Sequence, residues 1–120
     1  MVIIERVEEI PVALRTGDIT EETAKASFYI WRFSENNAVL CYVGLIPHSL
    51  ISTPIHLIWF HLAAESVRLR PSHIKAGRKF MRELCAYTKL IAIVENEDAY
   101  AWAKALGMQP TDKGNILWLK

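Results

Sequence analysis

The stretch that decides the fold is Val-Glu-Asn-Glu-Asp-Ala-Tyr-Ala-Trp-Ala-Lys-Ala-Leu-Gly-Met, residues 94–108. Asn96 is a favourable helix N-cap, and the acidic Glu97 and Asp98 suit the positive end of a helix dipole. Gly107 suits the left-handed conformation in which many helices end. The stretch is therefore predicted to be a helix that begins at Asn96 and ends at Gly107.

A basic helix and two apolar strands precede this stretch. Residues 90–94 form a compact apolar strand, and residues 55–63 are apolar on both faces, as expected of a central strand. Between them, from Pro71 onward, apolar residues recur at helical spacing while Lys75, Arg78, Lys79 and Arg82 fall largely on another, solvent-facing side. A helix that joins two strands in this way predicts a parallel strand pair.

The remaining segments complete a mixed pattern of strands and helices. Polar turn formers at 34–37 separate two β-rich runs and predict a hairpin. The other predicted elements are a strand at 2–7, a short helical turn at 8–14, a brief helix capped near Thr20 and a closing hairpin of 108–111 with 116–119. The fold class is therefore α+β, with a central mixed sheet of six to seven strands flanked by helices.

Composition limits the class of protein. The chain has 120 residues, 52% of them hydrophobic, and is predicted to be one soluble domain over residues 1–120. His56 and His61 interrupt its longest apolar stretch, so no membrane span is expected. The amino terminus lacks a secretion signal, which predicts a cytoplasmic protein. Cys41 and Cys85 are expected to be free core residues, and no metal site is predicted.

Charge is concentrated in one segment. The net charge is +1, yet residues 68–89 carry seven basic residues against Glu83 alone, which gives +6. Four aromatic residues near this segment could form a base-stacking surface, but their alternation fits one packed face of a sheet better, and the whole chain is not strongly basic. Nucleic acid is therefore not the expected partner. These aromatic residues are Tyr29, Trp31, Phe33 and Tyr42.

The order of elements and the segment 94–108 resemble the GNAT superfamily of acyl-coenzyme A dependent N-acyltransferases along nearly the whole chain. The segment is similar to that family's final strand and helix, N-x2-A-x6-L-G-F, with Met108 in place of Phe. More narrowly, Trp59-Phe60, the basic helix at 78–81 and the segment 96–107 resemble short GNAT-like bacteriophage proteins, which include an internal virion protein family. The resemblance implies a GNAT-like acyl-CoA N-acyltransferase fold.

The resemblance also implies a cofactor, acetyl-CoA or CoA. The family's glycine-rich phosphate loop is missing here, since no glycine occurs from Ala64 to Ala76. Cations crowd the start of the basic helix instead, where the helix dipole disfavours them and a bound anion would relieve the repulsion. The expected cofactor-binding residues are Leu62 and Ala63 in the central strand, Arg68, Arg70, Ser72 and Lys75 near the helix start, and Asn96.

The candidate catalytic residues depart from the pattern that the resemblance implies. The family's usual tyrosine acid would stand at the position of Ala103, so Tyr100, about one turn away, is the candidate proton donor. Candidate bases are Glu65 and His61, because a histidine titrates near neutrality, although a histidine in an aromatic strand is more often a core residue. His56 and His61 lie on opposite faces of a strand and cannot share a metal ion.

Two functions from different classes follow. The first is a small acyltransferase that carries an acetyl or acyl group from acyl-coenzyme A to an amine on a small molecule or a protein. The alternative is a catalytically degenerate GNAT scaffold that binds a protein partner in a phage virion or a host. Loss of the glycine loop and of the tyrosine favours the alternative, whereas the intact order of elements fits both.

Overall fold

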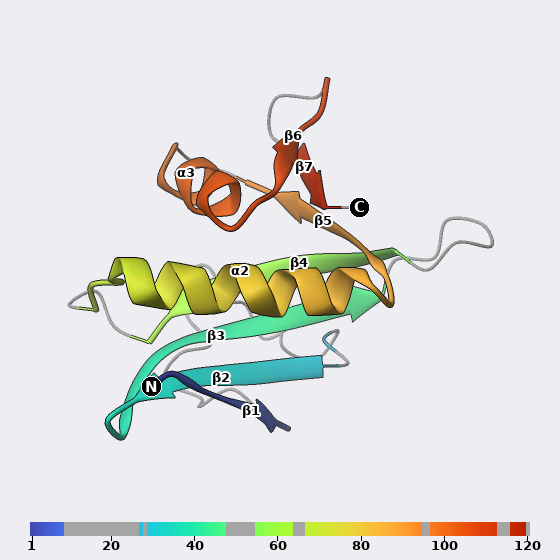
Figure 1. Cartoon of the computed structure of the whole chain (residues 1–120). Coiled ribbons are helices and arrows are strands. Elements are labelled where there is room, and N and C mark those ends of the chain that lie inside the picture. Colours follow the sequence, from blue (N-terminus) through green and yellow to red (C-terminus); the bar gives the residue numbers. More distant parts are fainter. Residues whose placement is uncertain are drawn as a thin grey trace. The chain divides into compact units, whose positions relative to one another are not determined.

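The computed structural model describes residues 1–8, 27, 29–47, 55–63, 67–94, 97–112 and 116–119. Figure 1 labels the elements along the chain. The predicted helical segments at 8–14 and after Thr20 lie outside the described residues, apart from Glu8. The elements are β1 (Ile3–Val7), β2 (Tyr29–Glu35), β3 (Ala38–Pro47), β4 (Ile55–Leu62), α2 (Pro71–Cys85), β5 (Lys89–Ile93), α3 (Glu97–Ala105), β6 (Gln109–Pro110) and β7 (Ile116–Leu119).

These strands form one seven-stranded mixed sheet in the order β1-β2-β3-β4-β5-β7-β6. β4 and β5 are parallel, joined through α2, and the pairs β1·β2, β2·β3, β5·β7 and β6·β7 are antiparallel. The predicted fold class and the predicted parallel pair are confirmed. Element ends differ from the predictions by one or two residues, as when β2 continues through Ser34 to Glu35 and β5 begins at Lys89 rather than Leu90.

The chain forms two compact units, residues 1–47 with 58–69, and residues 48–57 with 70–120. β4 therefore contributes its first residues to the second unit and its last residues to the first. The prediction of a single domain over the whole chain stays a prediction. None of the helices described is long and apolar enough to cross a membrane.

The first unit is built on the predicted hairpin. Asn36 and Asn37 form a two-residue turn between Glu35 and Ala38, and both have positive φ values, 53° and 64°. That conformation is the one that two-residue hairpin loops need and that asparagine tolerates. A shift of register between Phe33 and Ser34 marks a β-bulge in β2.

A close approach of β4 to β3 fixes the core of the first unit. The Trp59 indole lies directly over Gly44, where a Cβ would overlap the ring, and Trp59 Nε1 donates a hydrogen bond of 2.7 Å to Ser27 Oγ. Ile30 and Tyr42 are buried nearby, at 3% and 4% exposure. Gly44 is therefore required because of the space that the indole fills.

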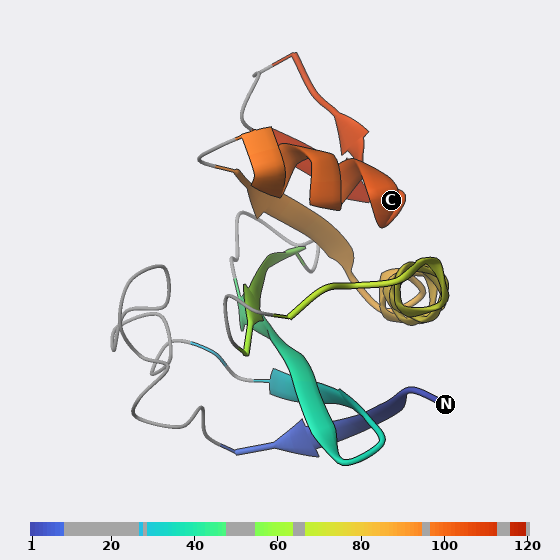
Figure 2. The same cartoon turned by 90° about the vertical axis from the view of Figure 1, so that its left-hand side faces the viewer.

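The second unit buries one face of its strands. Leu90 and Leu117 are fully buried, whereas Ile93, on the other face of β5, is 55% exposed. Figure 2 shows α3 beside β5. α2 approaches the end of α3 through Gly77, whose Cβ would press on Leu106 Cδ2 at 2.7 Å. The predicted basic side of α2 is exposed, and its apolar side is buried or half-buried.

α3 ends at Ala105, two residues before the predicted end, and Gly107 has the predicted left-handed conformation. Gly107 has a φ of 97°, its amide donates to Lys104 O at 3.0 Å, and the Met108 amide donates to Ala103 O at 3.0 Å. These two bonds define a Schellman motif, with the hydrophobic contact position at Met108 and Ala103, both buried. Asn96, the predicted N-cap, lies outside the described residues.

Both cysteines are free, as predicted. Cys41 is buried in β3, at 4% exposure, and confirms its assignment to the core, whereas Cys85 at the end of α2 is only half-buried. Within the described ranges no group of three or more metal-ligating side chains occurs.

Candidate functional site

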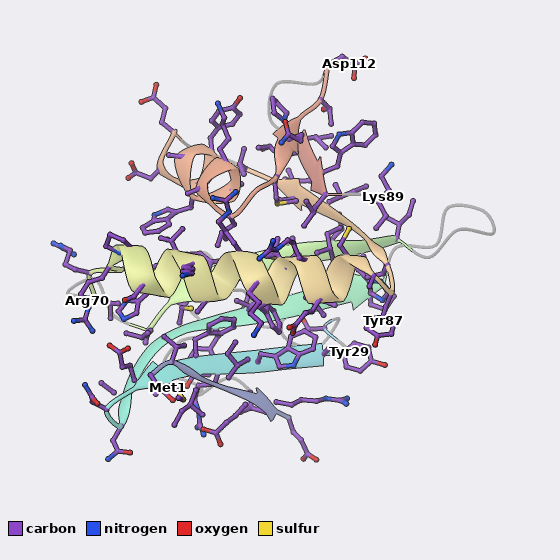
Figure 3. The ribbon with its side chains drawn as sticks, viewed as in Figure 1. Met1, Tyr29, Arg70, Tyr87, Lys89 and Asp112 are labelled. Carbon is purple, nitrogen blue, oxygen red and sulfur yellow. The ribbon has the colours of Figure 1, made fainter. Side chains whose placement is uncertain are left out.

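The amino-terminal end of α2 carries Arg70 at its N-cap and Lys75 at its fifth position. Arg70 is the N-cap, in an extended conformation, and Pro71 occupies the first helical position, where its missing amide hydrogen costs nothing. The first turn contains no acidic residue. Arg70, Ser72 and Lys75 are all exposed there, and Figure 3 shows Arg70 at this end of the helix.

The backbone amides of this first turn are largely committed within the helix. The amides of His73 and Ile74 both donate to Arg70 O, at 2.9 and 3.2 Å. Pro71 has no amide hydrogen. Because these amides are committed, an anion bound here would depend mainly on side chains, among them the Ser72 hydroxyl.

Arg68 lies in the irregular segment before α2. Its side chain is exposed, and Nη1 donates to Val67 O at 3.2 Å. Arg68 belongs to the first compact unit and Arg70 to the second. Arg70, Ser72 and Lys75 all lie near the start of α2, and their joint action, with or without Arg68, stays a prediction.

Leu62 is the last residue of β4, Ala63 follows it at a bend, and both are half-buried. The Ala63 amide donates to Leu40 O in β3 at 2.9 Å. The roles of both residues in cofactor binding stay predictions.

His61 is half-buried in β4. Strand alternation places it on the face that carries Trp59 and opposite to His56. His56 has a partner elsewhere, since its Nδ1 lies 2.7 Å from Thr88 Oγ1. The expectation that the two histidines share no metal ion and the role of His61 as a base both stay predictions.

Tyr100 is half-buried on α3, with Lys104 Nζ 5.7 Å from its ring centre. Ala103, at the position where the GNAT resemblance would place a tyrosine, is buried at 6% exposure. Glu65 and Asn96 lie outside the described residues. The roles assigned to Tyr100, Glu65 and Asn96 therefore stay predictions.

No pattern in the sequence predicted a role for His73. This residue is buried at the start of α2, and its Nδ1 accepts a hydrogen bond of 3.1 Å from the Arg70 amide. The signal was the spacing of three residues between them, which is that of a capping box. It was not recognised because neither arginine as an N-cap nor histidine at the third helical position belongs to the usual pattern.

No family model matches the chain, and no curated protein matches it by sequence. Solved structures do match. The chain is similar to a mutant of the AtaT toxin bound to the C-terminus of the antitoxin AtaR, at 16% identity and a TM-score of 0.63, over 99% of this chain and 91% of that one. It is also similar to AtaTR bound with AcCoA, at 17% identity and a TM-score of 0.62, over 98% and 92%.

A third similar structure is an IAA acetyltransferase from Bacillus cereus, at 18% identity and a TM-score of 0.69, over 93% of this chain and 79% of that one. The likeness confirms the predicted GNAT acyl-CoA N-acyltransferase fold. At such low identity the likeness concerns the fold and does not assign the activity.

Proposed function

We propose that the chain is a small N-acyltransferase that moves an acetyl group from acetyl-CoA to an amine on a small molecule or a protein. The observation that carries this proposal is the basic, acid-free start of α2, with Arg70, Ser72 and Lys75 exposed together on a GNAT fold. One structural neighbour is bound with AcCoA and another is named an acetyltransferase, which supports the same class of reaction.

The start of α2 would hold the cofactor phosphates by charge. Arginine forks and ammonium groups suit phosphate oxygens, and the Ser72 hydroxyl can donate a further hydrogen bond. Arg70 at the N-cap opposes the helix dipole by about 0.3–1 kcal/mol, and a bound anion removes that cost. Arg68, Leu62 and Ala63 are the further cofactor-binding residues that the sequence predicts, from the segment before α2 and the end of β4.

The cofactor supplies an activated acyl group as a thioester. His61 or Glu65 would accept the proton that the acceptor amine loses as its nitrogen bonds to the acyl carbon, while the carbon–sulfur bond breaks. The Tyr100 hydroxyl would donate a proton to the departing sulfur. Asn96 would contribute to cofactor binding at the start of α3. The cytoplasmic location stays a prediction from the sequence.

A second candidate function is a GNAT scaffold that has lost catalysis and binds a protein partner. Two observations favour it: the segment from Ala64 to Ala76 lacks glycine, and Ala103 stands where the family's tyrosine would be. Several structural neighbours are toxins in complexes with an antitoxin protein. The narrower attribution to phage virion proteins stays a prediction from sequence.

Thermal stability with added ligand separates these candidates. Acetyl-CoA and CoA should stabilise the protein at concentrations at which inorganic phosphate has no effect. Arg70→Gln should weaken CoA binding by about tenfold or more, because a charge-assisted hydrogen bond contributes about 1.5–3 kcal/mol. Arg82→Gln removes the same charge from the other end of α2 and should leave the affinity nearly unchanged.

Each outcome has a clear meaning. Stabilisation by CoA together with thiol release from acetyl-CoA in the presence of an amine supports the transferase. An equal response to CoA and phosphate indicates a general anion patch. Absence of any response would reject the transferase and favour the scaffold.

A further inference from the structure

β1 is an edge strand whose outer side is open. In the sheet order it has β2 on one side, and on its other side the described part of the chain places no strand (Figure 1). Four of its five residues, 3–6, are exposed. The strand contains no proline, and its register with β2 is regular from Ile3 to Val7. One row of its backbone N–H and C=O groups is therefore available to a further strand.

The strand at the other end of the sheet order has the protection that β1 lacks. β6 comprises only Gln109 and Pro110. Short strands and proline both discourage edge-to-edge pairing, because a short strand offers few backbone groups and proline has no amide hydrogen to donate. β1 is longer and consists mainly of β-branched residues, which favour the extended conformation. Its backbone is thus suited to a partner strand.

The charged side chains of β1 lie toward β2 and leave the free edge open. The Glu5 carboxylate lies 3.5 Å from Arg32 Nη2, and the Arg6 guanidinium lies 4.4 Å from the centre of the Tyr29 ring. Both of these partners belong to β2, on the side away from the free edge. Charges on an edge strand normally discourage pairing. Here they are held beside the strand to which β1 is already paired.

The side chains of β1 alternate between the two faces of the sheet, so Ile3, Glu5 and Val7 share one face and Ile4 and Arg6 share the other. Ile3 is 52% exposed and Ile4 is 38% exposed. Each face therefore presents apolar surface beside one charge. A strand paired antiparallel with all of β1 would fit best with a basic residue opposite Glu5, an acidic residue opposite Arg6 and apolar residues opposite the other three.

A second copy of this chain does not meet these requirements. In an antiparallel pair related by a two-fold axis, one residue lies opposite itself. The register that overlaps the whole of β1 places Glu5 opposite Glu5 of the second copy and Ile4 opposite Arg6. Like charges directly opposite each other are destabilising. The neighbouring symmetric registers overlap only residues 3–5 or 5–7 of the strand. The edge therefore favours a different chain.

We infer that the free edge of β1 binds an extended segment of another protein by strand addition. The segment pairs antiparallel with β1 and reads, from its amino end, apolar, acidic, basic, apolar, apolar. Backbone hydrogen bonds supply the affinity, and the alternating side chains supply the selectivity. The inference goes beyond the proposed function and does not depend on it, because β1 contributes no residue to the proposed cofactor site or to the catalytic groups.

Two synthetic peptides of the same composition test this inference. Both are blocked at their ends, and one has the sequence Val-Glu-Lys-Val-Ile while the other, Val-Lys-Glu-Val-Ile, has its two charges exchanged. The first should bind the full-length protein about fivefold more tightly or better, because both charge pairs change from attractive to repulsive in the second. NMR titration of isotope-labelled protein measures both affinities and should place the largest amide shifts in β1 and β2.

Methylated peptides test the backbone pairing directly. In an antiparallel pair only alternate residues of the peptide direct their amides to β1. Methylation of the amides of one or the other alternate set of Val-Glu-Lys-Val-Ile gives two peptides. One of them should lose binding, and the other should retain it. Because this measurement uses the wild-type protein, it does not depend on whether any variant folds.

Exchange of the two charges of β1 tests the selectivity from the protein's side. The double substitution Glu5→Lys with Arg6→Glu should reverse the preference between the two charged peptides. Arg82→Glu with Glu83→Lys is the matched control, because it makes the same exchange at two exposed neighbouring positions of α2. The control should leave both affinities within about twofold of wild type.

Several results would overturn the inference. These are equal affinity for the two charged peptides, no binding of either, and equal binding of the two methylated peptides. Dimerisation of the protein alone, with protection of the β1 amides from hydrogen exchange, would also overturn it, because a second copy would then occupy the edge. The CoA titrations described above involve other residues. Failure of peptide binding therefore leaves the proposed function intact, and failure of CoA binding leaves this inference intact.

Discussion

Cys41 shows at the scale of one residue how burial alters chemistry. Its side chain is 4% exposed within β3, and desolvation raises the pKa of its thiol from 9.0 to about 12. The thiol therefore remains protonated in the folded protein at pH values where it ionises in the unfolded chain. Cys41 acts as a small apolar residue and not as a nucleophile.

This shift predicts a loss of stability at alkaline pH. The folded pKa lies above the unfolded one, so the stabilising contribution is complete below pH 9.0 and is lost as pH rises toward about 12. In that window Cys41 should lower the free energy of unfolding by about 1.4 kcal/mol per pH unit. Urea denaturation from pH 8 to 11 measures this slope, and Cys41→Ala should flatten it. An equally steep slope in the variant would contradict the assignment.

At the scale of elements, the packing of β4 on β3 depends on the pair of Trp59 and Gly44. Gly44→Ala would place a methyl group inside the volume of the indole and should destabilise the protein by about 1–3 kcal/mol or more. The same substitution combined with Trp59→Leu should cost less than the sum of the two single changes, because the smaller side chain vacates that volume. Denaturant unfolding of the four proteins tests this. Strict additivity would show that the two residues do not compete for space.

The end of α3 provides an independent test. Gly107 has a φ of 97°, which a Cβ disfavours, so Gly107→Ala should destabilise the protein by about 1–2 kcal/mol. Gly107→Asn should cost less, since asparagine tolerates positive φ better. Lys104→Ala, at an exposed position in the last turn of α3, is the control and should change stability by less than about 0.5 kcal/mol. Melting temperatures that fail to separate Ala from Asn would argue against the Schellman ending.

Local signals explain which elements could be predicted from sequence. The Gly107 ending, the asparagine turn and the basic side of α2 each depend on residues a few positions apart, so propensity and periodicity suffice. The contact of Trp59 with Gly44 joins residues that are 15 positions apart. It depends on the tertiary packing of the indole, which no local sequence pattern encodes. At the site, the sequence predicts the basic start of α2 but not the cap formed by His73. The hydrogen bond from the Arg70 amide to the His73 ring becomes evident only from the positions of the two groups.

At the scale of the whole molecule, exposed charge should govern cofactor affinity. Arg70 and Lys75 are solvent-exposed, and added salt shortens the screening length from about 10 Å at 0.1 M to about 3 Å at 1 M. The affinity for CoA should therefore fall by about tenfold or more over that range in calorimetric titrations. Pantetheine, which carries no phosphate, is the control ligand and should show little change. Salt-independent CoA binding would contradict a charge-dominated site.

The division of β4 has a consequence for any attempt to shorten this protein. Ile55, His56 and Leu57 pair with Lys89, Leu90 and Ile91, yet they precede α2 in the chain. A fragment that begins at residue 70 would retain the pairing of β5 with β7 but would lack β4. The other edge of β5 would then be unpaired. The unpaired backbone N–H and C=O groups of an exposed edge strand can bind strands of other chains, which leads to aggregation. Such a fragment should therefore accumulate in inclusion bodies. Split-protein reporters based on this scaffold would therefore need their break point before Ile55.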